Sequence, residues 1–426
     1  MTVAVRQSRL LAVCLFASTC CAWSRPAVGA SEDTATVPQA VGLENGSPSV
    51  EVAPADFDYR ITNGYYATIT AFSFDEPKLL GENEVKLKGI PGFEKDLKVR
   101  VMWQNQPARL AVLLLGLGSR SKNKIAQLWK QQMFDAGCHV VTFDSPFLPA
   151  FNERSRHGVP GYVREEARLS AQIVNTLVQQ KDNKDKVTGV VLLGASYGGI
   201  MALNWMDLAQ SGEVPLRPEA ILAVSPPVNM HSAARRLDDF YRRYRWNYTL
   251  AKLGGDLLDH QPVGPGEAIP FTDEEMMAGI AAAFRLDLKE VIDYADSRYK
   301  LGQLPSASQH SDQYRRDMAS TWSFESYIHR MVYRYWNEKG VVRTIDDLWA
   351  SGDTVQLMSR MPKSVRLIIA ADDPLNEPSE LDRLRALAPS EQLTVLPYGG
   401  HMGFTKTEWL KKQVQAVCRC GAATKD

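Results

Sequence analysis

The sequence lacks an excess of charge of either sign. Its 426 residues include 49 lysines and arginines and 49 aspartates and glutamates, so the formal net charge at pH 7 is zero. Nucleic-acid-binding domains usually carry a strong positive charge, and we therefore expect no nucleic-acid partner. The apolar and charged shares, 45% and 23%, are those of a globular protein. Nothing in these numbers indicates an oligomeric state.

Cysteine is scarce, and the patterns of metal sites are missing. Of the six cysteines, the last three along the chain are Cys138, Cys418 and Cys420, and the others lie within the first 30 residues. Three cysteines do not suit a disulfide framework. The sequence contains neither a C-x-x-C pair nor H-E-x-x-H, which are common signatures of zinc sites. We therefore expect no metal and no cofactor.

The sequence also lacks a long apolar run. The longest, near residues 10–22, spans about a dozen residues, too few to cross a membrane comfortably. Arg6 and Arg9 precede it, and small residues end at Ala30, so residues 1–30 resemble a secretory signal peptide. This predicts an exported protein, periplasmic or secreted; the alternative is an uncleaved membrane anchor. Residues 31–55 are polar, rich in proline and free of aromatic residues, which predicts a flexible linker.

From residue 56 onward the pattern predicts one large α/β domain, 56–426. Short apolar runs typical of buried strands recur along it at 109–118, 138–146, 186–196, 219–228, 364–374 and 392–401. Helical patterns such as 163–180 lie between them. This alternation predicts a mostly parallel sheet with helices on both faces. Two earlier segments, "YYATITAF" at 65–72 and "DLKVRVMWQ" at 96–104, alternate in the manner of strands.

The chain between Val228 and Ser364 is far longer than a connection needs, and its pattern is helical. Thr272 with Glu275, and Thr344 with Asp347, have the spacing of capping boxes that begin helices. We expect an inserted helical cap over about residues 231–345.

One apolar run ends in a glycine-rich turn that carries a serine. Val190 to Leu193 predict a buried strand, and the residues after Gly199 predict a helix. Between them Gly194, Ser196 and Gly198 match G-x-S-x-G, a sharp turn that exposes a serine hydroxyl and strains its backbone. The motif alone occurs by chance and also resembles phosphate-binding turns. Its strand–turn–helix context favours a nucleophile.

A nucleophilic serine needs a histidine base and a carboxylate that holds the imidazole. His401 follows the last predicted strand between glycines, whereas the other histidines lie in a strand, a polar loop or the cap. The carboxylate is Asp372 or Asp373, since both directly follow a strand and spacing does not separate them. The resulting chain order, Ser, Asp, His, is that of α/β-hydrolases.

An oxyanion site needs backbone N–H groups beside the serine. Tyr197, the residue after the serine, would supply one. Leu117, between Gly116 and Gly118 in the loop after an earlier strand, is best placed to supply the second.

Taken together, these pieces resemble an α/β-hydrolase, and within that superfamily the YheT-like group of esterases. The resembling segments are "LLLGLGS", "GASYGG", "AVSPPVNMHSAARRLD", "ADDPLNEP" and "YGGHMGF". The resemblance implies the α/β-hydrolase fold, a cap between the sixth and seventh strands, and Asp373 as the acid of the triad. One departure is Leu115, which stands where members of the group usually have a histidine.

The sequence therefore predicts a serine hydrolase that cleaves an acyl ester through an acyl-enzyme, with Ser196, Asp373 and His401 as the triad. An amidase or peptidase with the same triad, or a non-catalytic binding protein on this fold, are the alternatives. The substrate is a small-molecule or lipid-like ester. In the cap, arginines interleave with aromatic residues at 235–248 and 326–336, which suggests the hypothesis of a peripheral contact with an anionic membrane surface.

Overall fold

The computed structural model describes residues 53–71, 73, 81–155, 158–244, 268–306 and 308–419. The predicted signal peptide, nearly all of the predicted linker, and Cys420 lie outside these residues. Within the described ranges, no helix is both long enough and apolar enough to cross a membrane.

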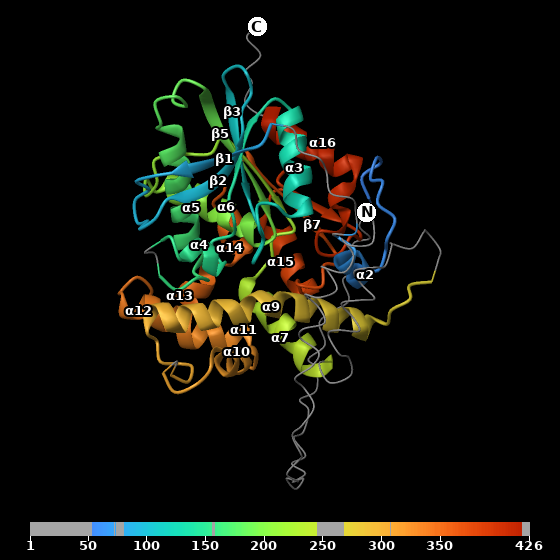
Figure 1. The fold of residues 1–426 in the computed structure, drawn as a ribbon. Helices are drawn as coiled ribbons and strands as arrows, with labels where there is room; N and C mark the ends of the chain where they lie inside the picture. The colour runs from blue at the N-terminus through green and yellow to red at the C-terminus, as the bar shows by residue number, and fades with distance from the viewer. Residues whose placement is uncertain are drawn as a thin grey trace, which may run out of the picture.

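Eight strands of the described chain form one sheet, in the order β1-β2-β4-β3-β5-β6-β7-β8 (Figure 1). β2 is antiparallel to both of its neighbours, and every other pair is parallel. The mostly parallel sheet predicted from the sequence is therefore confirmed. The strands are β1 (Asn83–Leu87), β2 (Leu97–Met102), β3 (Ala108–Leu114), β4 (His139–Thr142), β5 (Val187–Ala195), β6 (Ala220–Val224), β7 (Val365–Ala370) and β8 (Leu393–Leu396).

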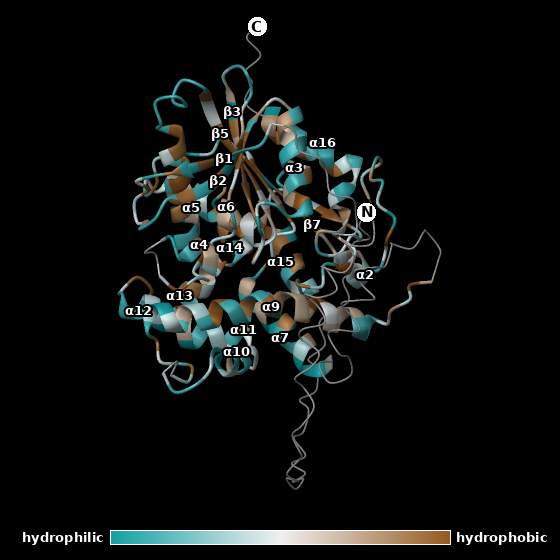
Figure 2. Ribbon diagram, viewed as in Figure 1, coloured by the Kyte–Doolittle hydropathy of each residue, from teal (hydrophilic) through white to brown (hydrophobic). Residues whose placement is uncertain are grey.

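Helices cover both faces of the sheet, as the alternating pattern predicts. One apolar core lies between the sheet and α5 (Val163–Val178), α6 (Tyr197–Gln210), α14 (Thr354–Met358) and α15 (Pro378–Leu387). A second core lies under α3 (Lys124–Asp135) and α16 (Glu408–Arg419) on the opposite face. Figure 2 shows apolar residues concentrated in the central strands of the sheet. The short helix α4 (Pro149–Asn152) follows β4.

The described residues between β6 and β7 are helical. They form α7 (Met230–Tyr244), α9 (Asp273–Tyr299), α10 (Asp312–Ser320), α11 (Phe324–Tyr327), a π-helical turn (Ile328–Tyr333), α12 (Arg334–Glu338), α13 (Ile345–Ala350) and α14. Both predicted capping boxes are present, at Thr272 and at Thr344. The long helix α9 crosses one end of the sheet (Figure 1), and this helical layer has an apolar core of its own.

Arginines of the helical layer contact aromatic rings within it. Arg285 lies 3.8 Å from the ring centre of Tyr241, and Arg330 lies 4.3 Å from that of Trp322. Such cation–π contacts stabilise the layer itself. The hypothesis that arginines of this layer contact a membrane stays a prediction. One of the arginines in the segment 235–248, Arg245, lies outside the described residues.

The prediction of a strand at "YYATITAF" is wrong. This segment forms α2 (Gly64–Ile69), whose first turn is capped by the Asn63 side chain, which accepts from the Tyr66 N–H. A short alternating run is ambiguous, and here tertiary packing decides the outcome, because Tyr66 and Ala67 are fully buried. Gly64 packs so closely on the loop after β7 that a Cβ there would lie 2.1 Å from the Asp372 carbonyl oxygen.

Candidate active site

Ser196 lies at the sharp turn between β5 and α6. Its backbone has φ 52° and ψ −120°, a conformation that L-residues rarely adopt, so the predicted strain is present. Its N–H donates to the Val224 carbonyl (2.8 Å), which ties the turn to the end of β6. Both glycines of the motif are required by close packing, since a Cβ at Gly194 or Gly198 would lie within 2.4 Å of a backbone oxygen.

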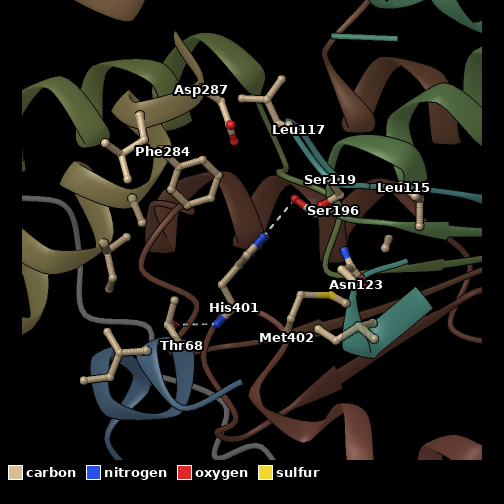
Figure 3. A pocket seen from close by; sticks show the side chains of 18 of the residues that line it. Thr68, Leu115, Leu117, Ser119, Asn123, Ser196, Phe284, Asp287, His401 and Met402 are labelled. Atoms are coloured by element: carbon tan, nitrogen blue, oxygen red, sulfur yellow. Dashed lines mark hydrogen bonds between the residues drawn. The ribbon is translucent and has the colours of Figure 1, made fainter. Parts of the chain in front are cut away.

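The structure brings together the three side chains that the sequence places at the ends of three strands. His401 Nε2 lies 2.9 Å from Ser196 Oγ, and His401 Nδ1 lies 2.8 Å from Asp373 Oδ2 (Figure 3 shows the serine and the imidazole). Asp373, His401 and Ser196 are buried, with exposed fractions of 3%, 6% and 9%. This geometry lets a histidine remove the serine proton while a carboxylate fixes the orientation of the ring.

Asp372 and Asp373, which their spacing from the strand does not separate, have different contacts. Asp373 contacts His401 and also accepts from the Leu375 N–H (2.9 Å). Asp372 instead accepts from the Gly400 N–H (2.8 Å), which holds the loop that carries the histidine. Burial raises the pKa of Asp372 to about 6, although the Gly400 and Gly399 N–H groups oppose that rise.

The two residues predicted to supply oxyanion N–H groups lie beside the serine. Within the described chain, neither the Leu117 nor the Tyr197 N–H donates to another protein group. Gly116, one residue before Leu117, is so close that a Cβ on it would lie 3.4 Å from Ser196 Cβ. Free N–H groups at this position can donate hydrogen bonds to an oxygen that develops negative charge.

A buried carboxylate that the sequence analysis missed holds Tyr197 in place. The Tyr197 hydroxyl donates to Glu166 Oε2 (2.6 Å), and the Gly161 N–H donates to Glu166 Oε1 (2.6 Å). Burial raises the pKa of Glu166 to about 6, while these two donors oppose the rise. Glu166 thus connects α5, the first residue of α6 and the loop under the helical layer. No pattern in the sequence predicts that Glu166 contacts Tyr197.

Replacing Tyr197 with phenylalanine is expected to lower the free energy of unfolding in a pH-dependent way. Because the folded pKa of Glu166, about 6, exceeds its ordinary value of 4.5, the fold loses stability as the pH rises from 4.5 through about 6, and the full penalty remains at higher pH. Loss of the hydroxyl enlarges that penalty. We expect a loss of about 1–3 kcal/mol at pH 8 and a clearly smaller loss at pH 5, where Glu166 is protonated, measured by urea unfolding.

Tyr327→Phe is the matched control for this experiment. The Tyr327 hydroxyl is also buried, but it donates to the neutral Pro160 carbonyl (2.7 Å). Its removal is expected to cost the same stability at pH 5 and pH 8. Equal losses at both pH values in the Tyr197 variant would contradict an ionised Glu166 above pH 6.

A cavity of about 530 Å³ opens beside Ser196 and His401. Its walls come mainly from the loop after β3, from α2, from α9 and from the His401 loop (Figure 3). Most of its lining is apolar, including Leu115, Ile125, Ile280, Phe284, Leu286 and Met402. A cavity of this size suits a small organic ligand that is largely apolar.

Three further residues around the site were not predicted. Thr68 of α2 accepts from the His401 N–H (2.8 Å) and thereby supports the loop. Phe284 of α9 lies beside the imidazole, with ring centres 6.4 Å apart, and Asp287 lies one helical turn further along α9. Thr68 lies in a segment predicted as a strand, and α9 gives only a helical pattern, so the sequence carries no signal for these contacts.

The other described histidines lie away from the cavity. The ring of His139 is held by the Gln104 N–H and the Lys186 carbonyl, and His231 pairs with Glu325 and stacks on Trp349. None of them lines the cavity. His157 and His260 lie outside the described residues.

The solved structures to which this chain is similar include several esterases at low sequence identity. A carboxyl esterase from the fungus Tuber melanosporum is 12% identical, with a TM-score of 0.43 over 83% of this chain and 95% of that one. An esterase from Pyrobaculum calidifontis is 13% identical, with a TM-score of 0.42 over 83% and 90%. A carboxyl esterase from Bacillus coagulans is 12% identical, with a TM-score of 0.40 over 80% and 98%.

No curated protein sequence matches the chain. A family model does match it, over residues 111–411, which run from within β3 to beyond β8 and include the helical layer and all three residues of the Ser–His–Asp arrangement. This match spans well over half of the chain, and the protein therefore belongs to the alpha/beta hydrolase family.

Proposed function

We propose that the protein is a serine hydrolase that cleaves a carboxylic ester through an acyl-enzyme intermediate. The observation that carries this proposal is the continuous chain of contacts from Ser196 Oγ through His401 to Asp373 at the wall of an apolar cavity. Membership of the alpha/beta hydrolase family supports it.

In the proposed reaction, Ser196 Oγ attacks the ester carbonyl carbon while His401 Nε2 takes the hydroxyl proton. Asp373 stabilises the imidazolium. The N–H groups of Leu117 and Tyr197 bind the oxyanion. The tetrahedral intermediate then expels the alcohol, which leaves with the proton from His401, and Ser196 carries the acyl group. Water, deprotonated by His401, releases the acid and regenerates the serine.

Several finer expectations belong to the same proposal. Residues 1–30 would direct export, residues 31–55 would form a linker, and the helices between β6 and β7 would form a cap over the site. The likeness to YheT-like esterases supports this cap, and α9 lines the cavity with residues such as Gly279 and Phe284. A cap that borders a cavity selects the substrate by shape.

The first test is labelling with a fluorophosphonate, which reacts with activated serines. We expect the purified protein to be labelled and the Ser196→Ala variant to remain unlabelled. Turnover of p-nitrophenyl esters of rising acyl length, beside matched p-nitroanilides, then separates an esterase from an amidase.

Labelling that persists in Ser196→Ala would place the nucleophile elsewhere and overturn the proposal. A folded, unlabelled wild-type protein that turns over no ester would favour the non-catalytic binding protein. Faster cleavage of anilides than of esters would favour the amidase.

A further inference from the structure

The cavity beside Ser196 contains one acidic side chain. Of the described residues that line it, Asp287 and His401 are the titratable ones, and the rest are apolar or neutral. The imidazole is already engaged with Ser196 and Asp373. Asp287 therefore decides the charge that a ligand meets in this cavity.

Asp287 extends from α9 onto the loop that carries the Leu117 N–H. A Cβ built on Gly118 would lie 2.0 Å from Asp287 Oδ2, so the carboxylate packs directly on this loop. Figure 3 shows Asp287 and Phe284 pointing from α9 toward the space in front of Ser196 and His401. Asp287 is half-buried, and within the described residues no hydrogen bond or ion pair engages its carboxylate.

No charged side chain near Asp287 in the described structure forms an ion pair with its carboxylate. Burial and then the charge of Glu290 raise its pKa to about 6, and Arg120 opposes this rise. Arg120 is exposed, so solvent screens its charge. His401 is the other titratable residue that lines the same cavity. Ionising a half-buried carboxylate that has no direct partner costs desolvation free energy. A positively charged ligand that pairs with the carboxylate offsets this cost.

Phe284 adds an aromatic ring next to this carboxylate. Phe284 and Asp287 are separated by three positions of α9 and therefore share one face of the helix. An aromatic ring face attracts cations, and quaternary ammonium groups are commonly bound between an aromatic ring and an acidic side chain. The remaining apolar walls suit an uncharged hydrocarbon part.

We propose that Asp287, with Phe284, is a specificity determinant that selects esters carrying a positively charged ammonium group beside an apolar chain. This inference rests on the proposed ester hydrolysis and names its substrate class. A ligand with a carboxylate or phosphate in the same position is repelled by Asp287. The positive group lies on either the alcohol or the acyl part of the ester.

The test compares charged substrates with neutral isosteres of the same shape. Butyrylthiocholine is compared with S-(3,3-dimethylbutyl) thiobutyrate, which places the charge on the leaving side. The p-nitrophenyl esters of 4-(trimethylammonio)butyrate and 5,5-dimethylhexanoate place it on the acyl side. For at least one pair we expect kcat/KM to favour the charged member at least about tenfold.

Asp287→Asn keeps the shape and removes the charge, and is expected to reduce that preference to about one. Glu290→Gln is the matched control, because Glu290 is an exposed carboxylate on the same helix that does not line the cavity. It should keep the wild-type preference within about twofold. The preference should also fall from pH 7.5 to pH 5 as Asp287 takes up a proton. Protonation of His401 slows both substrates equally, so it cancels in the ratio of their kcat/KM values.

A wild-type protein that hydrolyses the neutral esters without preferring either charged one would overturn this inference and leave the proposed hydrolase intact. So would a preference that survives in Asp287→Asn. Calorimetry with octyltrimethylammonium and 1-octanol on the Ser196→Ala variant measures the same selectivity without turnover. Tighter binding of the cation, lost when Asp287→Asn is added, is expected; equal binding would contradict the inference even in a protein without hydrolase activity.

Discussion

Asp373→Asn is expected to lower kcat/KM for the best ester by about 10⁴-fold, whereas Asp372→Asn should lower it tenfold at most. The two residues are adjacent in sequence, but only Asp373 contacts the imidazole, at 2.8 Å from Nδ1. An asparagine amide at that position donates to Nδ1 and so favours the tautomer with the proton on Nε2. A protonated Nε2 cannot accept the proton of Ser196. At position 372 an asparagine oxygen still accepts from the Gly400 N–H.

The comparison needs both variants to be folded, which circular dichroism and the unfolding midpoint establish. Steady-state kinetics on one p-nitrophenyl ester then gives the two ratios. A loss in Asp372→Asn as large as that in Asp373→Asn would show that support of the His401 loop, rather than contact with the ring, dominates catalysis. An Asp373→Asn variant with near wild-type activity would exclude it as the triad acid.

The positions of the three reacting side chains follow from chain order and strand pattern. Ser196, Asp373 and His401 each follow a strand, namely β5, β7 and β8, and these strands are parallel. Their carboxyl ends meet at one edge of the sheet, so three loops distant in sequence converge there. This is why strand pattern and chain order predict the residues that meet. They do not predict which of two adjacent aspartates turns toward the ring, and only the resemblance to known esterases favours Asp373.

The sequence predicts least where long-range contacts decide the structure. α2 reaches the site through Gly64, which packs on Asp372, and through the Asn63 side chain, which donates to Asp273 at the start of α9. These partners are about 200 residues or more from α2, and no periodicity encodes them. β1 was also missed, because its five residues, NEVKL, are mostly polar and exposed. The sequence likewise does not predict that Asp287 lines the cavity, because its position depends on how α9 packs on the loop after β3.

Gly198→Ala is expected to destabilise the fold by about 3 kcal/mol or more and to abolish labelling of Ser196. A Cβ at this position would lie 2.2 Å from the Leu114 carbonyl oxygen and 2.7 Å from that of Leu115. Both belong to the backbone at the end of β3, which has no side-chain rotamer through which to relax. The accommodating shift would push the start of α6 away from β3 and separate the Tyr197 N–H from the Leu117 N–H.

Gly199→Ala is the matched control, since it adds the same methyl group one residue later in the same helix. There the nearest atoms are the side-chain carbons of Pro226 and Ala223, at 3.1 and 3.3 Å, which is tight contact rather than overlap. In a helix, alanine is also favoured over glycine by about 1 kcal/mol, which offsets part of the strain. Urea unfolding should therefore give a change within about 1 kcal/mol for Gly199→Ala. Equal losses in the two variants would mean that the helix start tolerates no added volume at all, and that contact between residue 198 and the end of β3 is not what holds the serine turn.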